Sequence, residues 1–283
     1  MKNIIVPIDF SVDSLKGLEF ALMISKYLPV KIQLVYVQRK TDVPGNSDEE
    51  YKFADRNFTK LVQEYSSGLG ENSQLSYIIK KGKVYQEITS QAQAFADSLI
   101  IASTHGASGF EELFIGSNAY RIVCSTNKPV ITIRRHPVPQ KITKIVMPID
   151  ISIESRQKVM YTALFASVFG AEVHVVLVSS SQNKKILSRL NGYVAQVCNY
   201  LKTNNVKYVT ASVIAKSPIQ GLLQYTDENR AEMISIINED GEGITDLIIN
   251  GEAQQIISKS PVPVLTIRAK PHTIKESFST FGG

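Results

Sequence analysis

The sequence contains an internal repeat, and this repeat constrains the fold more than any other feature. Residues 6–11 read Val-Pro-Ile-Asp-Phe-Ser, and residues 147–152 read Met-Pro-Ile-Asp-Ile-Ser. A second pair of similar segments, residues 128–134 and 262–268, has nearly the same separation along the chain. Two similar segments in the same order and at nearly the same spacing indicate that the chain carries one unit twice.

Each copy alternates short β-branched runs with longer amphipathic runs, which is typical of parallel strands joined by crossover helices. In the first copy we expect strands at 3–8, 31–37, 74–80, 98–103 and 129–134, and helices at 12–28, 49–67, 84–96 and 116–125. In the second we expect strands at 144–149, 172–178, 206–214, 233–237 and 262–267, and helices at 153–169, 184–203, 218–229 and 250–259. The predicted fold is α/β, with two tandem doubly wound domains, each a five-stranded parallel sheet with helices on both faces.

The boundary between the copies is predicted near residue 140. Residues 136–140, His-Pro-Val-Pro-Gln, follow the last strand of the first copy, and their prolines suit a stiff linker. A chain of 283 residues is long enough for two domains with separate cores. We therefore expect domains at 1–140 and 141–270, followed by a C-terminal tail at 271–283.

Composition argues against several classes of protein. A hydrophobic fraction of 43% without any apolar run near the ~18 residues of a bilayer span, and without a signal peptide, predicts a cytoplasmic protein with no membrane partner. The densest basic group, Lys80, Lys81 and Lys83, lacks interleaved aromatic residues, so we expect a solvated strand end and no nucleic-acid partner. Cys124 and Cys198 fall one in each copy, which provides neither a disulfide framework nor a metal site.

A glycine-rich segment follows the fourth predicted strand. Residues 103–109 read Ser-Thr-His-Gly-Ala-Ser-Gly, and residues 116–119 read Gly-Ser-Asn-Ala at a predicted helix start. Glycine allows a ligand to approach the backbone, and the unpaired N–H groups and dipole of a helix N-terminus favour an anion. The segment alone is equally compatible with a phosphate-binding loop and with a turn before a capped helix.

At these residues the chain resembles the universal stress protein family, whose nucleotide-binding members carry Gly-x2-Gly-x9-Gly-Ser/Thr after the fourth strand. Gly106 and Gly116 are separated by residues 107–115, as the x9 of this pattern requires, and Ser117 follows. Residues 7–9, Pro-Ile-Asp, match an early motif of the family, and Val37 ends the second strand where the family contacts the base. The resemblance spans both copies and implies an adenine-nucleotide site formed by Pro7, Ile8, Asp9, Val37, Ser103, Gly106, Gly109, Gly116, Ser117 and Asn118.

Two positions depart from the family pattern. Ser103 stands where the family has its first glycine, and Ala107 where many members have arginine or lysine. A charge near a phosphate contributes roughly 1 to 4 kcal/mol at about 4 Å, so its absence weakens binding. ATP or AMP, with or without Mg²⁺, and an empty pocket therefore all stay open. His105 has no evident nucleophile or carboxylate partner, and the resemblance implies a structural role for it.

Asp9 has two compatible roles in this scheme. It lies with Val37 and the glycine-rich segment at carboxyl ends of neighbouring strands, where doubly wound sheets bind ligands. There it can accept hydrogen bonds from ribose or hold a metal-bound water. It can also cap Val12 or Asp13 at the start of the next helix, for which Ser11 is the expected N-cap.

The second copy lacks this glycine-rich segment. Its corresponding stretch, residues 239–252, holds five acidic residues and no basic one, at positions 239, 240, 242, 246 and 252. Such a stretch repels phosphates, although Asp150 and Val178 are kept at the strand ends. We predict that the second copy does not bind a nucleotide.

The resemblance implies a stress-response regulator whose two copies pair through their last strands, 130–134 and 264–268. It is not chiefly an enzyme, and at most a slow ATPase, because no general base or arginine finger can be named. A nucleotide-independent interaction scaffold is the alternative. A homodimer and an unidentified protein partner remain open.

Overall fold

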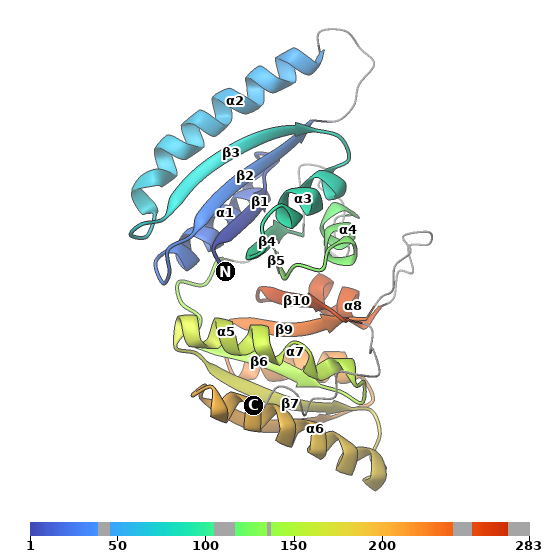
Figure 1. Ribbon diagram of the computed structural model, residues 1–283. Helices are drawn as coiled ribbons and strands as arrows, with labels where there is room; N and C mark the ends of the chain where they lie inside the picture. Colours follow the sequence, from blue (N-terminus) through green and yellow to red (C-terminus); the bar gives the residue numbers. More distant parts are fainter. Residues whose placement is uncertain (39–45, 105–116, 135–136, 240–250, 271–283) are drawn as a thin grey trace.

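The structure is a computed structural model that describes residues 1–38, 46–104, 117–134, 137–239 and 251–270 (Figure 1). The first half contains strands β1 (Asn3–Pro7), β2 (Lys31–Gln38), β3 (Gln74–Lys81), β4 (Ser98–Ser103) and β5 (Val130–Ile133). Its helices are α1 (Val12–Ser25), α2 (Asn46–Tyr65), the short η1 (Ser66–Gly68), α3 (Val84–Gln93) and α4 (Ser117–Ser125).

The second half repeats this order of elements. Its strands are β6 (Lys144–Ile149), β7 (Glu172–Ser179), β8 (Tyr208–Ile214), β9 (Met233–Asn238) and β10 (Val264–Arg268). Its helices are η2 (Glu154–Arg156), α5 (Val159–Phe169), α6 (Lys184–Thr203), α7 (Pro218–Glu228) and α8 (Glu252–Lys259). The predicted repeat of strands and helices is confirmed. The predicted tail, residues 271–283, lies outside the described residues.

All ten strands form one sheet, in the order β3-β2-β1-β4-β5-β10-β9-β6-β7-β8 (Figure 1). Neighbouring strands within each half are parallel, whereas β5 and β10 pair antiparallel, with Ile131 opposite Leu265. The last strands of the two halves therefore lie edge to edge, as expected. Each strand covers an edge that would otherwise expose unpaired backbone groups.

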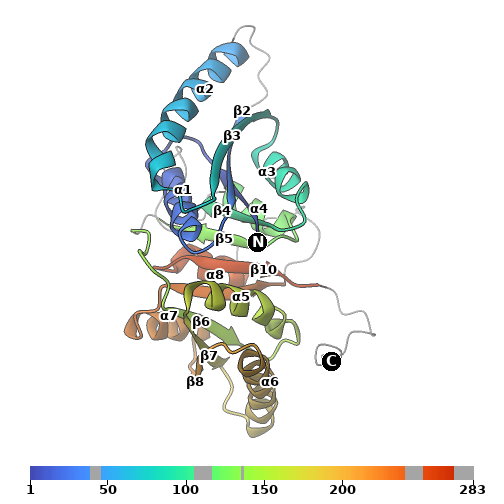
Figure 2. The ribbon, with the colours of Figure 1, turned by 60° about the vertical axis from the view of Figure 1, so that its left-hand side comes forward.

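Helices cover both faces of the sheet, and Figure 2 shows α1 and α2 opposite α3 and α4 in the first half. Strand side chains alternate between faces, so Ile4 and Val6 of β1 belong to one core while Ile5 belongs to the other. The first core includes Phe20 of α1 and Phe165 of α5. The doubly wound fold class is thus confirmed in both halves.

The start of α5 differs from the prediction of a helix over residues 153–169. Residues 154–156 instead form the short 3-10 helix η2, and α5 begins only at Val159. In the first half, α1 begins at Val12, directly after its N-cap Ser11, as expected. The two halves therefore share the strand-to-helix order but not the geometry of the first crossover.

One close contact between helix and sheet in the first half is not shared by the second. A Cβ added to Gly17 would lie 3.1 Å from Cγ1 of Val6 and 3.2 Å from the carbonyl oxygen of Ile101. Glycine therefore lets α1 lie close against the sheet. Lys158 stands at the corresponding position when residues 6–11 are aligned with residues 147–152. The second half therefore lacks the glycine that permits this approach, and α5 begins directly after Lys158.

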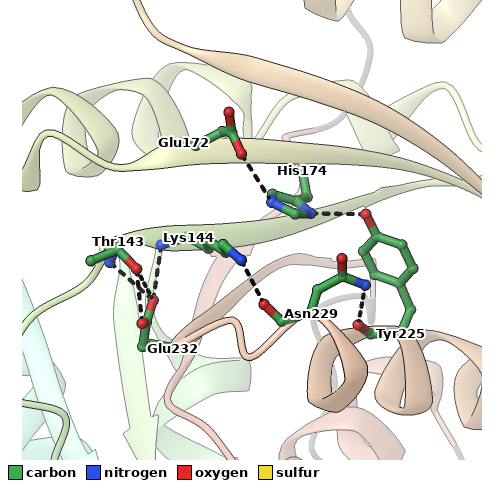
Figure 3. Close-up of polar contacts among 7 residues, drawn as sticks. All are labelled: Thr143, Lys144, Glu172, His174, Tyr225, Asn229 and Glu232. Carbon is green, nitrogen blue, oxygen red and sulfur yellow. Dashed lines mark hydrogen bonds and ion pairs between the residues drawn. The ribbon is translucent and has the colours of Figure 1, made fainter.

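A polar network anchors the amino-terminal ends of the second half's strands (Figure 3). The Glu232 carboxylate accepts hydrogen bonds from the backbone N–H groups of Thr143 and Lys144, each at 2.9 Å. The Lys144 ammonium donates to the Asn229 carbonyl at 2.9 Å. These bonds connect the start of β6 to the turn between α7 and β9.

His174 of β7 lies in the same region and is 4% exposed (Figure 3). Its Nδ1 lies 2.8 Å from the hydroxyl of Tyr225, and its Nε2 lies 3.3 Å from a carboxylate oxygen of Glu172. This arrangement favours the tautomer with its proton on Nε2, facing Glu172, while Nδ1 accepts from Tyr225. Burial lowers the pKa of His174 and raises the pKa of Tyr225. The His174 imidazole is therefore neutral and the Tyr225 phenol protonated, which indicates a structural role for both residues.

We predict that His174 makes stability depend on pH below neutrality. Its folded pKa is lowered from 6.5, so the unfolded chain binds the proton more readily, and the free energy of unfolding falls as pH drops through about 6.5. Urea unfolding at about pH 7.5 and about pH 5.5 measures this loss. His174→Asn keeps an acceptor for Tyr225 but cannot titrate, and should show a smaller loss. An equal loss in both proteins would contradict the assignment.

Candidate functional site

The first half has a switch point between β1 and β4. β1 pairs with β2 on one side and with β4 on the other. The chain leaving β1 enters α1 on one face of the sheet, whereas α4, the next described element after β4, packs on the opposite face. Doubly wound sheets bind their ligands at the carboxyl ends of the strands beside such a switch point.

Asp9 lies just after β1, at this switch point. Its Oδ1 accepts hydrogen bonds from the backbone N–H of Ser11 at 3.0 Å and from the Ser11 hydroxyl at 2.5 Å. The same hydroxyl caps α1 by accepting from the backbone N–H of Ser14 at 3.1 Å. Asp9 therefore orients the helix cap, and because its side chain is exposed it is also accessible to a ligand.

The other described candidates lie at the same edge of the sheet. Ile8 and Val37 are 3% and 9% exposed, so each would present mainly backbone groups and a small apolar surface. Ser103 is half-buried at the end of β4, and Ser117 and Asn118 begin α4. Pro7, at the end of β1, is also half-buried. These residues come from neighbouring strands and the helix that follows β4.

The three glycines among the predicted candidates, Gly106, Gly109 and Gly116, fall outside the described residues. His105 and Ala107 also fall outside them. Their proposed contact with phosphates stays a prediction.

An aromatic cluster next to the end of β1 was missed by the sequence analysis. Phe10 has a φ of 62°, which is unusual for a residue with a side chain. Its ring stacks on Tyr36 at 5.3 Å and meets the edges of Phe53 and Phe58 at 5.7 and 5.0 Å. The Tyr36 hydroxyl donates to Glu50 of α2 at 2.8 Å. The cluster fixes α2 against the end of β1, next to Asp9.

The predicted basic group is engaged within the first half. Lys80 forms an ion pair with Glu87 at 3.4 Å, and Lys81 donates to the Ser47 hydroxyl at 3.1 Å. These contacts agree with the expected place of the basic group, at the end of strand β3.

The corresponding edge of the second half has different chemistry. Ser152 donates its backbone N–H to Asp150 at 2.7 Å, as Ser11 does to Asp9, but its hydroxyl bonds to Glu239. Burial raises the pKa of Glu252, and the charges of Asp150 and Glu239 raise it further. Within the described ranges, no group of histidine, cysteine and acidic residues is suited to hold a metal ion.

Neither cysteine is arranged as a reactive site. Neither forms a disulfide, and burial raises the pKa of Cys198, which disfavours the thiolate. The Sγ of Cys124, in the last turn of α4, accepts a hydrogen bond from Asn238 of β9 at 3.7 Å. This contact crosses between the two halves. Across the described residues, no helix is both long and apolar enough to span a bilayer.

Comparison with solved structures gives the same fold over nearly the whole chain. A universal stress protein from Archaeoglobus fulgidus DSM 4304 is 18% identical, with a TM-score of 0.78 over 94% of this chain and 98% of that chain. A putative universal stress protein from Pseudomonas aeruginosa UCBPP-PA14 is 16% identical, with a TM-score of 0.68 over 95% of this chain and 94% of that chain. The comparison with curated proteins finds no match.

The family-level comparison agrees with the internal repeat. The model of the universal stress protein family matches twice, over residues 1–134 and again over residues 141–268. Because the two matches together cover most of the chain, this protein belongs to the universal stress protein family and carries two of its domains in tandem.

Proposed function

We propose that the N-terminal half binds one adenine nucleotide, ATP or AMP, and that the chain acts in the cytoplasm as a stress-response regulator. The observation that carries the proposal is the position of Asp9, Val37, Ser103 and the start of α4 around one switch point. Ligands of doubly wound sheets bind at this place.

Each part of a nucleotide has a chemically suitable partner there. The phosphates would lie at the start of α4, where the first-turn N–H groups and the helix dipole favour anions. The ribose hydroxyls would donate to the exposed carboxylate of Asp9, and adenine would lie against Val37 at the end of β2. When Mg²⁺ accompanies the phosphates, Asp9 would hold one of its waters.

Helix α4 offers a route from this site to the second half. It runs from Ser117 to Ser125 and spans about 13 Å at about 1.5 Å per residue. Its first turn would contact the phosphates, and its last turn contains Cys124, which is bonded to Asn238. A nucleotide that binds one position of α4 better than another would therefore shift the arrangement of the paired halves.

A second candidate function, a nucleotide-independent scaffold, is favoured by the outward face of α5. Met160 and Leu164 lie one turn apart and are 47% and 41% exposed. Residues 159–169 include no charged side chain. Exposed apolar surfaces of this kind are typical of interaction sites, so a second chain or another protein could cover this face. Slow ATP hydrolysis is the third candidate, without a named general base.

Titration of the full chain with ATP, ADP and AMP, with and without Mg²⁺, tests the leading proposal. We expect one nucleotide per chain, and at least a tenfold loss of affinity, about 1.4 kcal/mol, in Gly116→Val, because a side chain there blocks the backbone from the phosphates. Asn250→Val, the matched change in the second half, should leave affinity unchanged. The absence of nucleotide binding in the wild type would favour the scaffold. Loss of binding only in Asn250→Val would place the nucleotide site in the second half.

A gain of affinity provides an independent test of the phosphate position. Ala107→Lys adds a charge worth about 1 kcal/mol at about 4 Å in a solvated setting, which is roughly fivefold in the dissociation constant for ATP. The gain should shrink at high salt, because solvated charges are screened. Unchanged affinity at low salt would contradict this placement, and steady phosphate release would favour the enzyme.

A further inference from the structure

A buried lysine lies at the strand ends of the second half, where the first half has its proposed site. Lys158 is 1% exposed, and its ammonium donates to the carbonyl of Ser155 at 2.5 Å. Burial lowers the pKa of Lys158 to about 8, whereas the negative charges of Asp150 and Glu239 oppose this shift. The lysine therefore lies close enough to two carboxylates to interact with their charges.

Three positions near these strand ends differ in charge from the first half. Lys158 corresponds to Gly17 when residues 147–152 are aligned with residues 6–11. Glu239 directly follows β9 as Thr104 directly follows β4. Glu252 corresponds to Asn118 when residues 262–268 are aligned with residues 128–134. Three neutral residues of the first half are thus one lysine and two glutamates in the second.

The hydrogen bonds of one serine differ between the two halves. In the first half, the Ser11 hydroxyl donates to Asp9. In the second half, the Ser152 hydroxyl bonds to Glu239, while its backbone N–H still donates to Asp150. The Ser152 hydroxyl also accepts from the backbone N–H of Ser155, whose carbonyl accepts from Lys158. Ser152 and Ser155 therefore connect Lys158 to the two carboxylates whose charges act on it.

The energetics of buried charge explain why Lys158 needs nearby carboxylates. A buried ammonium without a counter-charge is costly, and carboxylates that gather without a cation repel one another. Removing a counter-charge from a buried ion leaves that ion uncompensated. Lys158 is buried whereas Glu239 is exposed, so it is the burial of Lys158 that depends on the carboxylates.

We propose that Lys158 is a built-in counter-ion that closes the strand-end site of the second half from within. Its ammonium donates to the Ser155 carbonyl and lies in the negative field of Asp150 and Glu239, so its positive charge is not offered to a phosphate. The part of this inference that concerns nucleotide exclusion rests on the proposed function, and the part that concerns the ion cluster does not.

A double-mutant cycle in the full chain tests the ion cluster. The variants are Lys158→Met, Glu239→Gln and both together, and the readout is the unfolding equilibrium constant from urea unfolding. We expect the double variant to be more stable than the combined effects of the two single changes predict. Its unfolding equilibrium constant should be smaller than that prediction by about tenfold or more. The partly exposed surface pair Lys16–Glu19, at 2.9 Å, is the matched control, and its cycle should give less than about threefold.

The cycle remains decisive when a variant fails to fold. If Lys158→Met is unfolded, rescue by Glu239→Gln supports the counter-ion. Additive single changes, or an unfolded double variant beside a folded Glu239→Gln protein, would overturn it.

A second titration separates this inference from the proposed function. ATP is titrated into Gly116→Val and into Gly116→Val combined with Lys158→Met. We expect no binding to the second half in either protein. Residual binding to Gly116→Val that disappears with Lys158→Met would make Lys158 a phosphate ligand and overturn the inference. Failure of the wild type to bind ATP would remove the proposed function and leave the stability cycle unaffected.

Discussion

The antiparallel pairing of β5 with β10 determines how the two halves can work together. Each half alone is a parallel sheet, so its strands all end at one edge. Because the join reverses the strand direction, the carboxyl ends of the two halves lie at opposite edges of a single ten-stranded sheet. A helix that runs back along the join, such as α4, begins near one of these edges and ends near the other.

The carboxyl ends of the strands carry different chemistry in the two halves. In the first half, Gly17 allows a close helix, and the end of β1 presents the exposed carboxylate of Asp9. In the second half, Lys158 stands at the position of Gly17 and is buried near the negative charges of Asp150 and Glu239. The first half thus presents an exposed carboxylate at its strand ends, whereas the second adds a buried lysine to its acidic residues. Fusion in one chain allows this divergence, because the two copies need not share a sequence.

The order of strands and helices was predicted well, because the repeat and the local alternation of apolar residues are both read from neighbouring positions. The late start of α5 was not predicted from local periodicity, and contacts between a helix and strands distant in the sequence, such as that of Gly17 with Ile101, leave no local signal. For the same reason, the stacking of Phe10 on Tyr36 and the His174 contacts were missed. The candidate site was predicted as an edge of the sheet, and the glycines expected to contact phosphates lie beyond the described residues.

The most direct test of the account is a crystal structure of the full chain soaked with ATP or AMP. The account predicts density for one nucleotide between the ends of β1 and β4, with its base near Val37 and its phosphates at the first turn of α4. The strand ends near Asp150 and Glu252 should hold none. Nucleotide density at the second half alone, or at both halves, would contradict the division of roles described here.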